Sequence, residues 1–346
     1  MLIDAWFPKD ETSPGVWGGG QVHVRELRSR LVADYGCQVE LFYAAHKNLL
    51  IRSLWVLWVV ADVLLYSRYH PQIHLLHSHG YYSGLAAKLI GFFLKVPVVH
   101  TVHATPALDQ AKKSPKLLIE KWLLTKLHYQ AEISLSSHFL KYPNVNQRLS
   151  VIPNGVNIQA FNQVRVVKYP TTTLIWVGQA DPSKGLAVLK AALVKVRRLY
   201  PELKTELVTG GRLSGRAIIK AYKKSHLFCL PSLAESQPIA LLEAWAAKLP
   251  VVVTRVGENQ TMVKSGINGL LVDPGNAQQL AKALLQLLRS PRRATAMGLA
   301  GYNLVKNHYS WDQVVAQTYA VYLEVLQTSA MAAENKLVFG LNPHEN

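Results

Sequence analysis

The sequence predicts an α/β protein made of two doubly wound, Rossmann-like domains that face a central cleft. Short apolar segments alternate with helical patterns along most of the 346 residues. Continuous runs rich in Val, Ile and Leu are typical of parallel strands that are buried on both faces. One polar stretch, residues 149–173, interrupts this alternation. The chain is also long for one domain and comfortable for two.

Six segments are predicted as strands because they are compact, apolar and bounded by Gly, Pro or Ser. They are residues 39–44 (VELFYA), 74–79 (HLLHSH), 97–103 (PVVHTVH), 174–179 (LIWVGQ), 226–232 (HLFCLPS) and 250–255 (PVVVTR). Helical patterns fall between them, for example at residues 23–35, 82–95 and 186–200. Alternating βα units form open parallel sheets. Because ligands bind such sheets beyond the carboxyl ends of the strands, the residues after each strand are candidates for the functional site.

The polar stretch is interpreted as a junction between the domains. We expect a first domain at residues 1–152 and a second at residues 153–309. A last helix, at residues 310–327, carries apolar residues at helical spacing, and residues 328–346 form a weakly patterned tail.

The charge balance favours anionic partners. The chain has 38 Lys and Arg against 21 Asp and Glu, a formal net charge of +17. Because no basic segment is interleaved with aromatic residues, nucleic acid is not an expected partner. Cys37 and Cys229 are far apart, so no disulfide scaffold is expected. No signal-peptide pattern is visible, and a cytoplasmic location is predicted.

One strongly apolar helix is predicted at residues 49–66 (LLIRSLWVLWVVADVLLY), where the longest uncharged run is residues 53–61. That run is too short for a bilayer span, which needs about 20 apolar residues. Two interpretations stay open: a buried helix, or an interfacial helix that docks on a membrane. Residues 111–129 also mix lysines with apolar residues. The second interpretation predicts peripheral contact with the inner face of the membrane.

The segment GQADPSKG, residues 178–185, follows a predicted strand. Pro182 and Ser183 indicate a helix start, which places Lys184 in the first turn. A lysine beside free backbone N–H groups suits a phosphate. The alternative is an ordinary βα loop with a solvated lysine.

The segment ESQPIALLEAW, residues 235–245, follows another predicted strand. Ser236 is expected to cap a helix that has Pro238 in its first turn. Glu235 precedes the helix, and Glu243 lies two turns further along on the same side. The separation rules out a shared proton, but it suits a long polyhydroxylated ligand held at two points. The alternative is that Glu243 caps a neighbouring loop.

Glycines and histidines mark the other domain. Gly18, Gly19 and Gly20 precede a helix and allow close approach of the backbone to a ligand, but they do not form a dinucleotide fingerprint. His77 and His79 alternate on a strand end and face the same way. No carboxylate or cysteine completes a metal-binding set beside them, so no metal is expected. His103, at a strand end, is a candidate for a polar ligand contact.

Together these motifs resemble the family 4 retaining glycosyltransferases, which have the two-domain GT-B fold. The resemblance runs from about Trp6 to Leu326. Residues 235–276 are its most specific part and are similar to the family's E-x7-E segment and the glycine-bearing loops that follow. Similarity extends to the segments HSHGYYSG, PVVHTVHA, RLSVIPNGVN, WVGQADPSKG and YSWDQVVAQTYAVY. The last of these resembles the helix that crosses back to the first domain in this fold.

The resemblance implies a UDP- or GDP-linked sugar as donor, and transfer to an acceptor hydroxyl with retained anomeric configuration. Glu235 and His103 would contact the donor sugar, Glu243 the ribose, and Lys184 the diphosphate. The remaining donor-binding residues would be Gly19, Gly20, Gln179, Ser236, Gln237, Pro238 and Ile239. No separate cofactor or metal is implied. The acceptor would be a glycan or lipid-linked molecule in the synthesis of a cell-surface glycan or glycolipid.

Two departures from the family pattern keep other functions open. Gln179 stands where the family usually has an arginine, and the passage from residues 203–208 to residues 226–232 is short. These features are compatible with a catalytically degenerate GT-B binding or partner subunit. A nucleotide-sugar epimerase is a third hypothesis.

Overall fold

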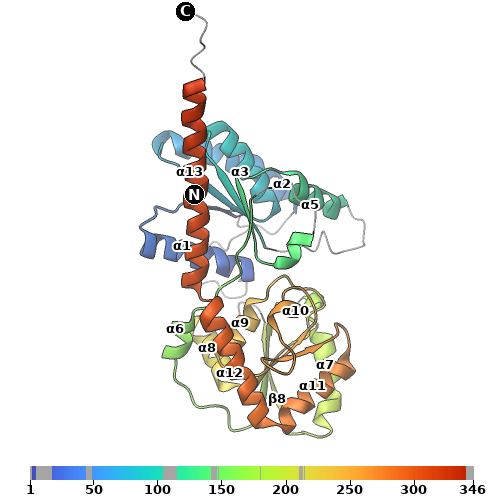
Figure 1. Ribbon diagram of the computed structural model, residues 1–346. Coiled ribbons are helices and arrows are strands. Elements are labelled where there is room, and N and C mark those ends of the chain that lie inside the picture. The colour runs from blue at the N-terminus through green and yellow to red at the C-terminus, as the bar shows by residue number, and fades with distance from the viewer. Residues whose placement is uncertain are drawn as a thin grey trace, which may run out of the picture.

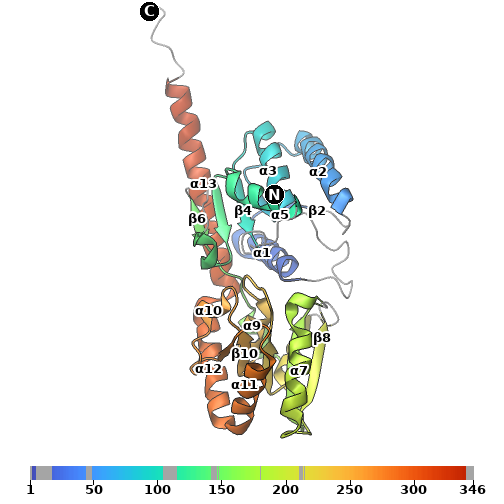
Figure 2. The same ribbon diagram turned by 90° about the vertical axis from the view of Figure 1, so that its right-hand side faces the viewer.

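The computed structural model describes most of the chain. The described residues are 2–4, 18–43, 49–103, 115–141, 146, 148–179, 181–209, 213 and 215–339; the side chains of 2–4, 49–53, 115–117 and 332–339 are outside the description. Two parallel sheets, each flanked by helices, lie one above the other, and the long last helix runs beside the upper sheet (Figure 1; Figure 2 turns the view by 90°).

The first sheet has six parallel strands in the order β2-β1-β3-β4-β5-β6. Their bounds are β1 Leu2–Asp4, β2 Leu41–Tyr43, β3 Leu76–His79, β4 Val98–Val102, β5 Ala131–Ser134 and β6 Leu149–Val151. The chain passes from β1 to β2 on one side and then to β3 on the other. A ligand crevice is therefore expected beyond the carboxyl ends of β1 and β3, where the strand order reverses.

The second sheet has five parallel strands in the order β11-β10-β9-β7-β8. Their bounds are β7 Thr173–Gly178, β8 Lys204–Thr209, β9 Leu227–Leu230, β10 Val251–Thr254 and β11 Leu270–Val272. Here the order reverses between β7 and β9. Its crevice therefore follows Gly178 and Leu230, which end these two strands. Among the described residues between β8 and β9, one helix is present, α8 (Gly215–Lys224).

The other helices cover the faces of the sheets. Their bounds are α1 Gly19–Tyr35, α2 Leu49–Tyr69, α3 Tyr81–Leu94, α5 Pro115–Lys126, η1 Ser137–Lys141, α6 Ile158–Gln163, η2 Pro182–Lys184, α7 Leu186–Arg197, α9 Ile239–Ala246, α10 Asn259–Met262, α11 Ala277–Arg289, α12 Pro291–His308 and α13 Trp311–Phe339. The predicted fold class, two doubly wound parallel sheets, is confirmed. All six predicted strands and the three predicted helices named above are present.

The apolar helix α2 is buried on one side only. Trp55, Val59 and Val63 belong to the core beneath it, whereas Leu57 and Trp58 are exposed to solvent. The interpretation of a buried helix therefore holds for one face of α2 and not for the other. Of the helices described, none has the combined length and apolar content that a membrane span requires.

Helix α13 starts at the second sheet and packs on the first. Val314, Val315 and Val325 share a core cluster with Val24 and Leu27 of α1. The helix continues to Phe339, so part of the expected tail is helical. The first sheet thus receives a core helix from the opposite end of the chain.

Candidate active site

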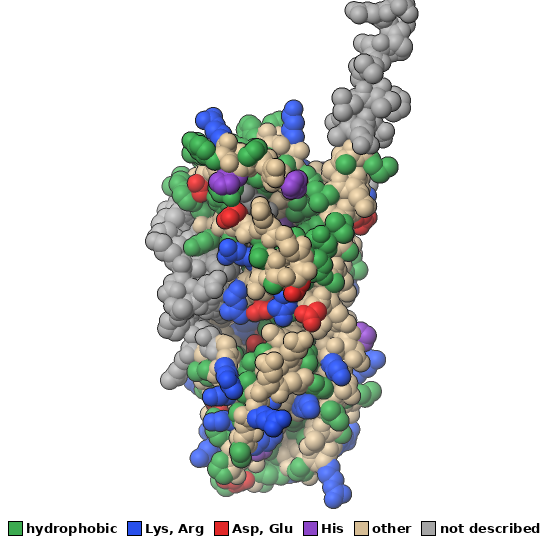
Figure 3. All heavy atoms as spheres, turned by 90° about the vertical axis from the view of Figure 1, so that its left-hand side faces the viewer, with side chains coloured by type: hydrophobic (Ala, Val, Ile, Leu, Met, Phe, Trp, Pro, Cys, Tyr) green, Lys and Arg blue, Asp and Glu red, His purple; other side chains and the backbone are tan. Residues whose placement is uncertain are grey.

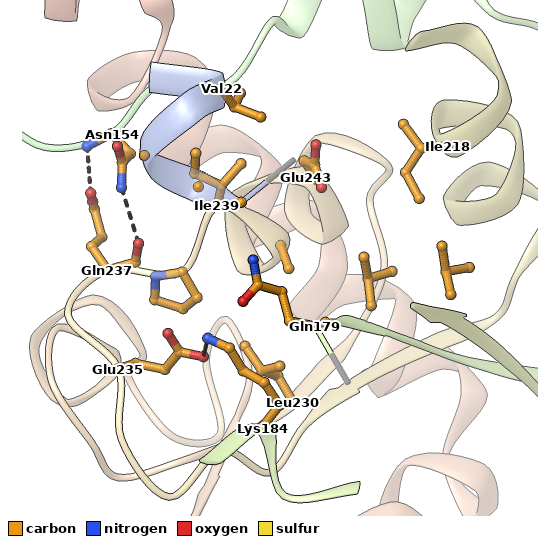
Figure 4. Close-up of a pocket in the computed structure, with 18 of the residues that line it drawn as sticks. Val22, Asn154, Gln179, Lys184, Ile218, Leu230, Glu235, Gln237, Ile239 and Glu243 are labelled. Carbon is orange, nitrogen blue, oxygen red and sulfur yellow. Dashed lines mark hydrogen bonds and ion pairs between the residues drawn. The ribbon is translucent and has the colours of Figure 1, made fainter. Parts of the chain in front are cut away.

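A cavity of about 410 Å³ opens between the two sheets, at the crevices predicted by their strand orders. Every residue proposed from the sequence as a site residue lines it. These are Gly19, Gly20, His103, Gln179, Lys184, Glu235, Ser236, Gln237, Pro238, Ile239 and Glu243. Figure 4 shows Lys184 and Glu235 facing each other in one part of the cavity, with Glu243 and Ile218 in another.

Lys184 projects from a short 3₁₀ turn directly after β7. The carboxylate of Asp181 accepts a hydrogen bond from the Ser183 amide at 2.7 Å and starts this turn. Gly185 ends it in the left-handed conformation, with φ of 66°, and α7 begins only afterwards. The expected helix start is therefore a single 3₁₀ turn that contains Lys184, and the α-helix begins only after Gly185.

Lys184 reaches across the crevice to Glu235. Its Nζ lies 2.7 Å from Glu235 Oε1, and the two side chains are 24% and 8% exposed. Ser232 Oγ donates a second hydrogen bond to the same oxygen at 2.8 Å. Among the described residues, no hydrogen bond or ion pair reaches the other oxygen, Oε2. Glu235 is thus held in place with one acceptor atom left for a ligand.

A glycine fixes the loop that carries Glu235. A Cβ atom at Gly257 would lie 2.0 Å from the Glu235 carbonyl oxygen, and φ of Gly257 is 48°. Only glycine fits such a close approach in the left-handed region. The backbone next to it also binds the loop, because the Glu258 amide donates to the Ser236 carbonyl at 2.8 Å.

Helix α9 begins two residues later than the sequence indicated. Pro238 is its N-cap, and no side chain caps it. The expected Ser236 cap is therefore wrong, since Ser236 belongs to the loop joined to Glu258. The first amides of a helix have no partner within it and carry partial positive charge. Those of α9 begin at Ile239, on the wall of the cavity.

Gln237 connects this loop with the junction between the sheets. Its side-chain oxygen accepts a hydrogen bond from the backbone N–H of Asn154. Its carbonyl oxygen accepts one from Asn154 Nδ2 at 3.0 Å (Figure 4). The oxygen of Asn154 in turn bonds His23 Nδ1 at 3.0 Å. A continuous polar chain therefore runs from the α9 loop to α1.

Glu243 lies two turns into α9, beside Ile218 and Val208. Its Oε2 accepts a hydrogen bond from the Tyr222 hydroxyl at 2.9 Å. Burial raises the pKa of Glu243 to about 7, while the Tyr222 bond and the positive charge of Arg25 act in the opposite direction. Its partner is a tyrosine of α8, so Glu243 does not cap a loop.

His103 belongs to a group of packed imidazoles at the end of the first sheet. Its Nε2 lies 3.0 Å from His79 Nδ1, and its ring centroid is 5.0 Å from that of His23. Burial and mutual repulsion hold the pKa of His79 and of His103 well below the usual value. Both rings are therefore neutral near pH 7. Within the described residues, no group of three or more His, Cys, Asp or Glu side chains is arranged to hold a metal ion.

The three glycines at the start of α1 are the N-cap Gly18 and the first helical residues Gly19 and Gly20, and they bring loops of the two sheets together. A Cβ atom at Gly18 would lie 2.8 Å from Gln179 Nε2. One at Gly19 would contact Ile239 at 3.6 Å, and one at Gly20 would contact His103 at 3.8 Å. The start of α1 thus rests on the residues that follow β7 and on the start of α9. Figure 3 shows the recessed region between the two halves of the molecule, with Lys and Arg side chains around it.

Several lining residues were not predicted from the sequence, and two of them have polar side chains on the first-domain side of the cavity or at the junction. Arg25 of α1 adds a cation on the first-domain side, and Asn154 lies at the junction. Arg25 follows Gly18 by seven residues, about two turns, which places both on the same side of α1. Asn154 is part of the PNG turn in the polar stretch. The spacing of Arg25 from the glycines and the PNG turn around Asn154 are the sequence signals that could have identified these two residues.

Comparisons with known proteins identify the class of this site. Residues 17–160 match the family model described as Glycosyltransferase Family 4, and residues 155–290 match Glycosyl transferases group 1. The fold and the cleft are those of a GT-B glycosyltransferase. The chain belongs to the group 1 glycosyltransferases of family 4 type.

Known glycosyltransferases resemble this chain in sequence, and solved structures resemble it in fold. The chain is 25% identical to D-inositol 3-phosphate glycosyltransferase of Thermobispora bispora, over 92% of this chain and 93% of the relative. It is 26% identical to UDP-Gal:alpha-D-GlcNAc-diphosphoundecaprenol alpha-1,3-galactosyltransferase of Escherichia coli, over 62% and 66%. Sucrose-phosphate synthase of Thermosynechococcus elongatus superposes with a TM-score of 0.76, at 19% identity over 94% and 99%. Anabaena HepE in complex with UDP gives 0.69, at 16% identity over 94% and 100%.

Proposed function

We propose that this glycosyltransferase moves a sugar from a nucleotide-diphosphate sugar to an acceptor hydroxyl and retains the anomeric configuration. The observation that carries the proposal is the Lys184–Glu235 pair beside the start of α9. It places a cation, helix amides and a carboxylate acceptor within one cavity. Those are the groups that a diphosphate next to a sugar requires.

Each part of the donor has a matching part of the cavity. Glu243, at the end lined by Val208 and Ile218, binds the ribose hydroxyls. Lys184 and the first amides of α9 bind the diphosphate, and Glu235 Oε2 accepts a hydroxyl of the sugar. Ser236, Gln237, Pro238 and Ile239 shape the turn that receives the phosphates.

The first domain supplies the opposite wall. His103 contacts the donor sugar near the reacting carbon, as a neutral ring. Gly19 and Gly20 let the backbone approach the phosphates closely. Gln179 contributes an amide to the same end, where it donates without adding charge.

The proposed step is a displacement on one face of the sugar. The bond from the anomeric carbon to the phosphate oxygen breaks, and a bond to the acceptor oxygen forms on the same face. The acceptor proton passes to the departing phosphate oxygen, so no side chain acts as the base. The main catalytic task is to stabilise the developing charge on the diphosphate, for which Lys184 and the α9 amides are placed. These groups neutralise the phosphates without a metal ion.

The comparisons support a choice of donor and acceptor classes. The names of the E. coli galactosyltransferase and of the HepE complexes with UDP and UDP-glucose favour UDP over GDP. The E. coli relative acts, by its name, on a lipid diphosphate. We therefore propose a lipid-linked or glycan acceptor in the synthesis of a cell-surface glycan or glycolipid, at the cytoplasmic face of the membrane.

Calorimetric titration with UDP and with GDP, first in EDTA and then with Mg²⁺, tests the donor site. Binding of UDP in EDTA that is weakened at least tenfold by Lys184→Ala supports the proposal. Absence of nucleotide binding, together with a stable protein partner, would make the chain a binding subunit. NMR of the product made from an α-linked UDP-sugar tests retention, and a β-linked product would overturn it. Conversion of the sugar without any acceptor would identify an epimerase.

A further inference from the structure

Three adjacent helices on the outside of the first domain expose large apolar side chains to solvent. Helix α2 packs against α3, and α3 packs against α5, on the same side of the sheet (Figures 1 and 2). The exposed apolar side chains are Leu54, Leu57, Trp58 and Leu65 of α2, Leu89, Phe92 and Phe93 of α3, and Leu118, Ile119 and Trp122 of α5. We call these ten residues the outer apolar surface.

The fold does not account for this surface. Helix α2 already buries one apolar stripe, including Trp55 and Val59, against the core. Leu54, Leu57 and Trp58 recur at helical spacing on its other side and form a second stripe that faces solvent. A helix that covers a sheet needs only the first stripe. Exposed apolar side chains that gather on adjacent helices in this way indicate an interaction site.

Each of the three helices exposes at least one large aromatic side chain. Phe92 is 78% exposed, Trp58 60% and Trp122 56%, one on each of the three helices. In the second domain, large exposed apolar residues such as Leu199, Ile267 and Leu299 come from separate elements. Such single residues are normal on a protein surface. The clustering is therefore a property of the three helices and not of the whole chain.

Basic side chains accompany the outer apolar surface. Arg68, Lys95, Lys121 and Lys126 are exposed on or directly after the same helices, and Lys88 is half-buried among them. Acidic side chains are few on this side. Glu120 of α5 is buried and Asp62 of α2 is half-buried. An apolar centre with aromatic residues and a basic fringe matches lipid acyl chains beneath anionic headgroups.

We propose that the outer apolar surface docks on the surface of an anionic lipid bilayer. Trp58, Phe92 and Trp122 enter the boundary between headgroups and acyl chains, where amphipathic and aromatic rings are stable. The lysines pair with the anionic headgroups. A second copy of this chain is a poorer occupant, because the symmetric contact would bring like charges together. The inference rests on the fold and not on the donor chemistry.

Co-sedimentation with vesicles tests the proposal. The probes are vesicles of phosphatidylcholine alone and of phosphatidylcholine with phosphatidylglycerol, at low and at high salt. Wild-type protein is expected to sediment with the anionic vesicles, and less at high salt. The triple variant Trp58→Glu, Phe92→Glu, Trp122→Glu is expected to lower the bound fraction at least tenfold. The matched variant Leu199→Glu, Ile267→Glu, Leu299→Glu is expected to bind like wild type.

Thermal unfolding and UDP titration of both triple variants verify that they are folded. If UDP binding fails in every protein but the vesicle results hold, the proposed donor chemistry fails and the docking surface stands. Absence of wild-type binding to anionic vesicles, or equal loss in both triple variants, would overturn the docking proposal. So would a wild-type dimer in light scattering that becomes a monomer in the first variant, because the surface would then join two copies.

Discussion

Lys184 Nζ and Glu235 Oε1 lie 2.7 Å apart, although their residues follow different strands, β7 and β9. The order of the second sheet reverses between these two strands. The pair therefore sits at the position where open parallel sheets bind ligands. An ion pair that is largely removed from water is weak evidence for stability, because desolvation opposes the attraction between the charges. The placement of Lys184 beside Glu235 is better explained by a ligand that needs a cation and a hydrogen-bond acceptor side by side.

Replacing Lys184 by alanine is expected to lower kcat/KM by about a hundredfold or more. The ammonium faces the proposed diphosphate, and loss of one preorganised charge that stabilises a transition state has effects of this order. Steady-state kinetics with a UDP-sugar measure the change. Lys190→Ala, in an exposed position one turn into α7, is the control. Near-normal turnover of Lys184→Ala would remove Lys184 from the mechanism.

The raised pKa of Glu243 predicts a pH-dependent affinity for UDP. Burial holds that pKa at about 7, so the carboxyl is protonated below pH 7 and ionised above it. If the ionised form accepts the ribose hydroxyls, binding tightens as pH rises through 7. Below it, affinity falls by up to about tenfold for each pH unit. Calorimetry across this range measures the slope.

The matched protein for this experiment is Glu243→Gln, which cannot titrate at that position. The phosphates of UDP also titrate, with a pKa near 6, so the two proteins are compared at each pH. The difference between their affinities is expected to grow as the pH rises. If the UDP affinities of the two proteins change in parallel with pH, the ionised Glu243 carboxylate does not contact the nucleotide.

Gln179→Arg is expected to tighten UDP binding about tenfold. Gln179 lines the cavity beside Lys184, and a guanidinium there would add a charge-assisted hydrogen bond worth about 1.5–3 kcal/mol. Calorimetry gives the affinity, with Gln179→Met as the variant that removes the amide without adding charge. Equal affinities of the arginine and methionine variants would show that this position does not reach the phosphates.

His103→Ala is expected to lower kcat by about a hundredfold while changing UDP affinity by less than threefold. The expected split follows from the proposed contact of His103 with the sugar, since His103 follows β4 of the first sheet whereas Glu243, the proposed ribose ligand, belongs to α9. Kinetics and calorimetry on the same protein separate the two effects. His128→Ala, at an exposed position, is the control. An equal loss of UDP affinity would place His103 at the nucleotide instead.

Trp311→Ala is expected to reduce the free energy of unfolding by about 3–5 kcal/mol, the usual cost for a large buried aromatic. Trp311 is almost fully buried, beside the backbone of Gly155 and the ring of His23. Denaturant unfolding measures the change. Leu323→Ala, at an exposed position on the same helix, is expected to stay within about 0.5 kcal/mol. Equal losses of unfolding free energy in both variants would show that burial of the Trp311 ring does not stabilise the packing of α13 against the first sheet.

The sequence was sufficient for the fold class, for six of the eleven strands among the described residues and for residues that line the cavity. Buried parallel strands are apolar runs, and the residues that follow them have local signals: Pro182 and Lys184 after β7, Glu235 after β9, His103 after β4. Short or polar strands were missed. β8 is an edge strand with mostly half-buried residues, and β5 contains the buried Glu132. Neither shows a continuous apolar run.

Contacts across the fold could not be predicted. Lys184 and Glu235 are 51 positions apart, and their meeting depends on β7 lying next to β9. Ser236 is a residue type that often caps helices. Its loop is held instead by Gly257 and Glu258, which follow β10, and Pro238 is the N-cap of α9. The outer stripe of α2 is as apolar as its buried stripe. The packing of α2 on its neighbours in the fold therefore determines which stripe is exposed to solvent.

The position of α13 has a consequence for synthesis on the ribosome. All six strands of the first sheet have been made once Val151 is in the chain, but Trp311, Val315 and Val325 of their core come much later. At ordinary translation rates this interval is about 10–30 s. The second domain, continuous in sequence, can close first. The part of the chain that emerges first is therefore the last to become native, and a chaperone has time to hold it.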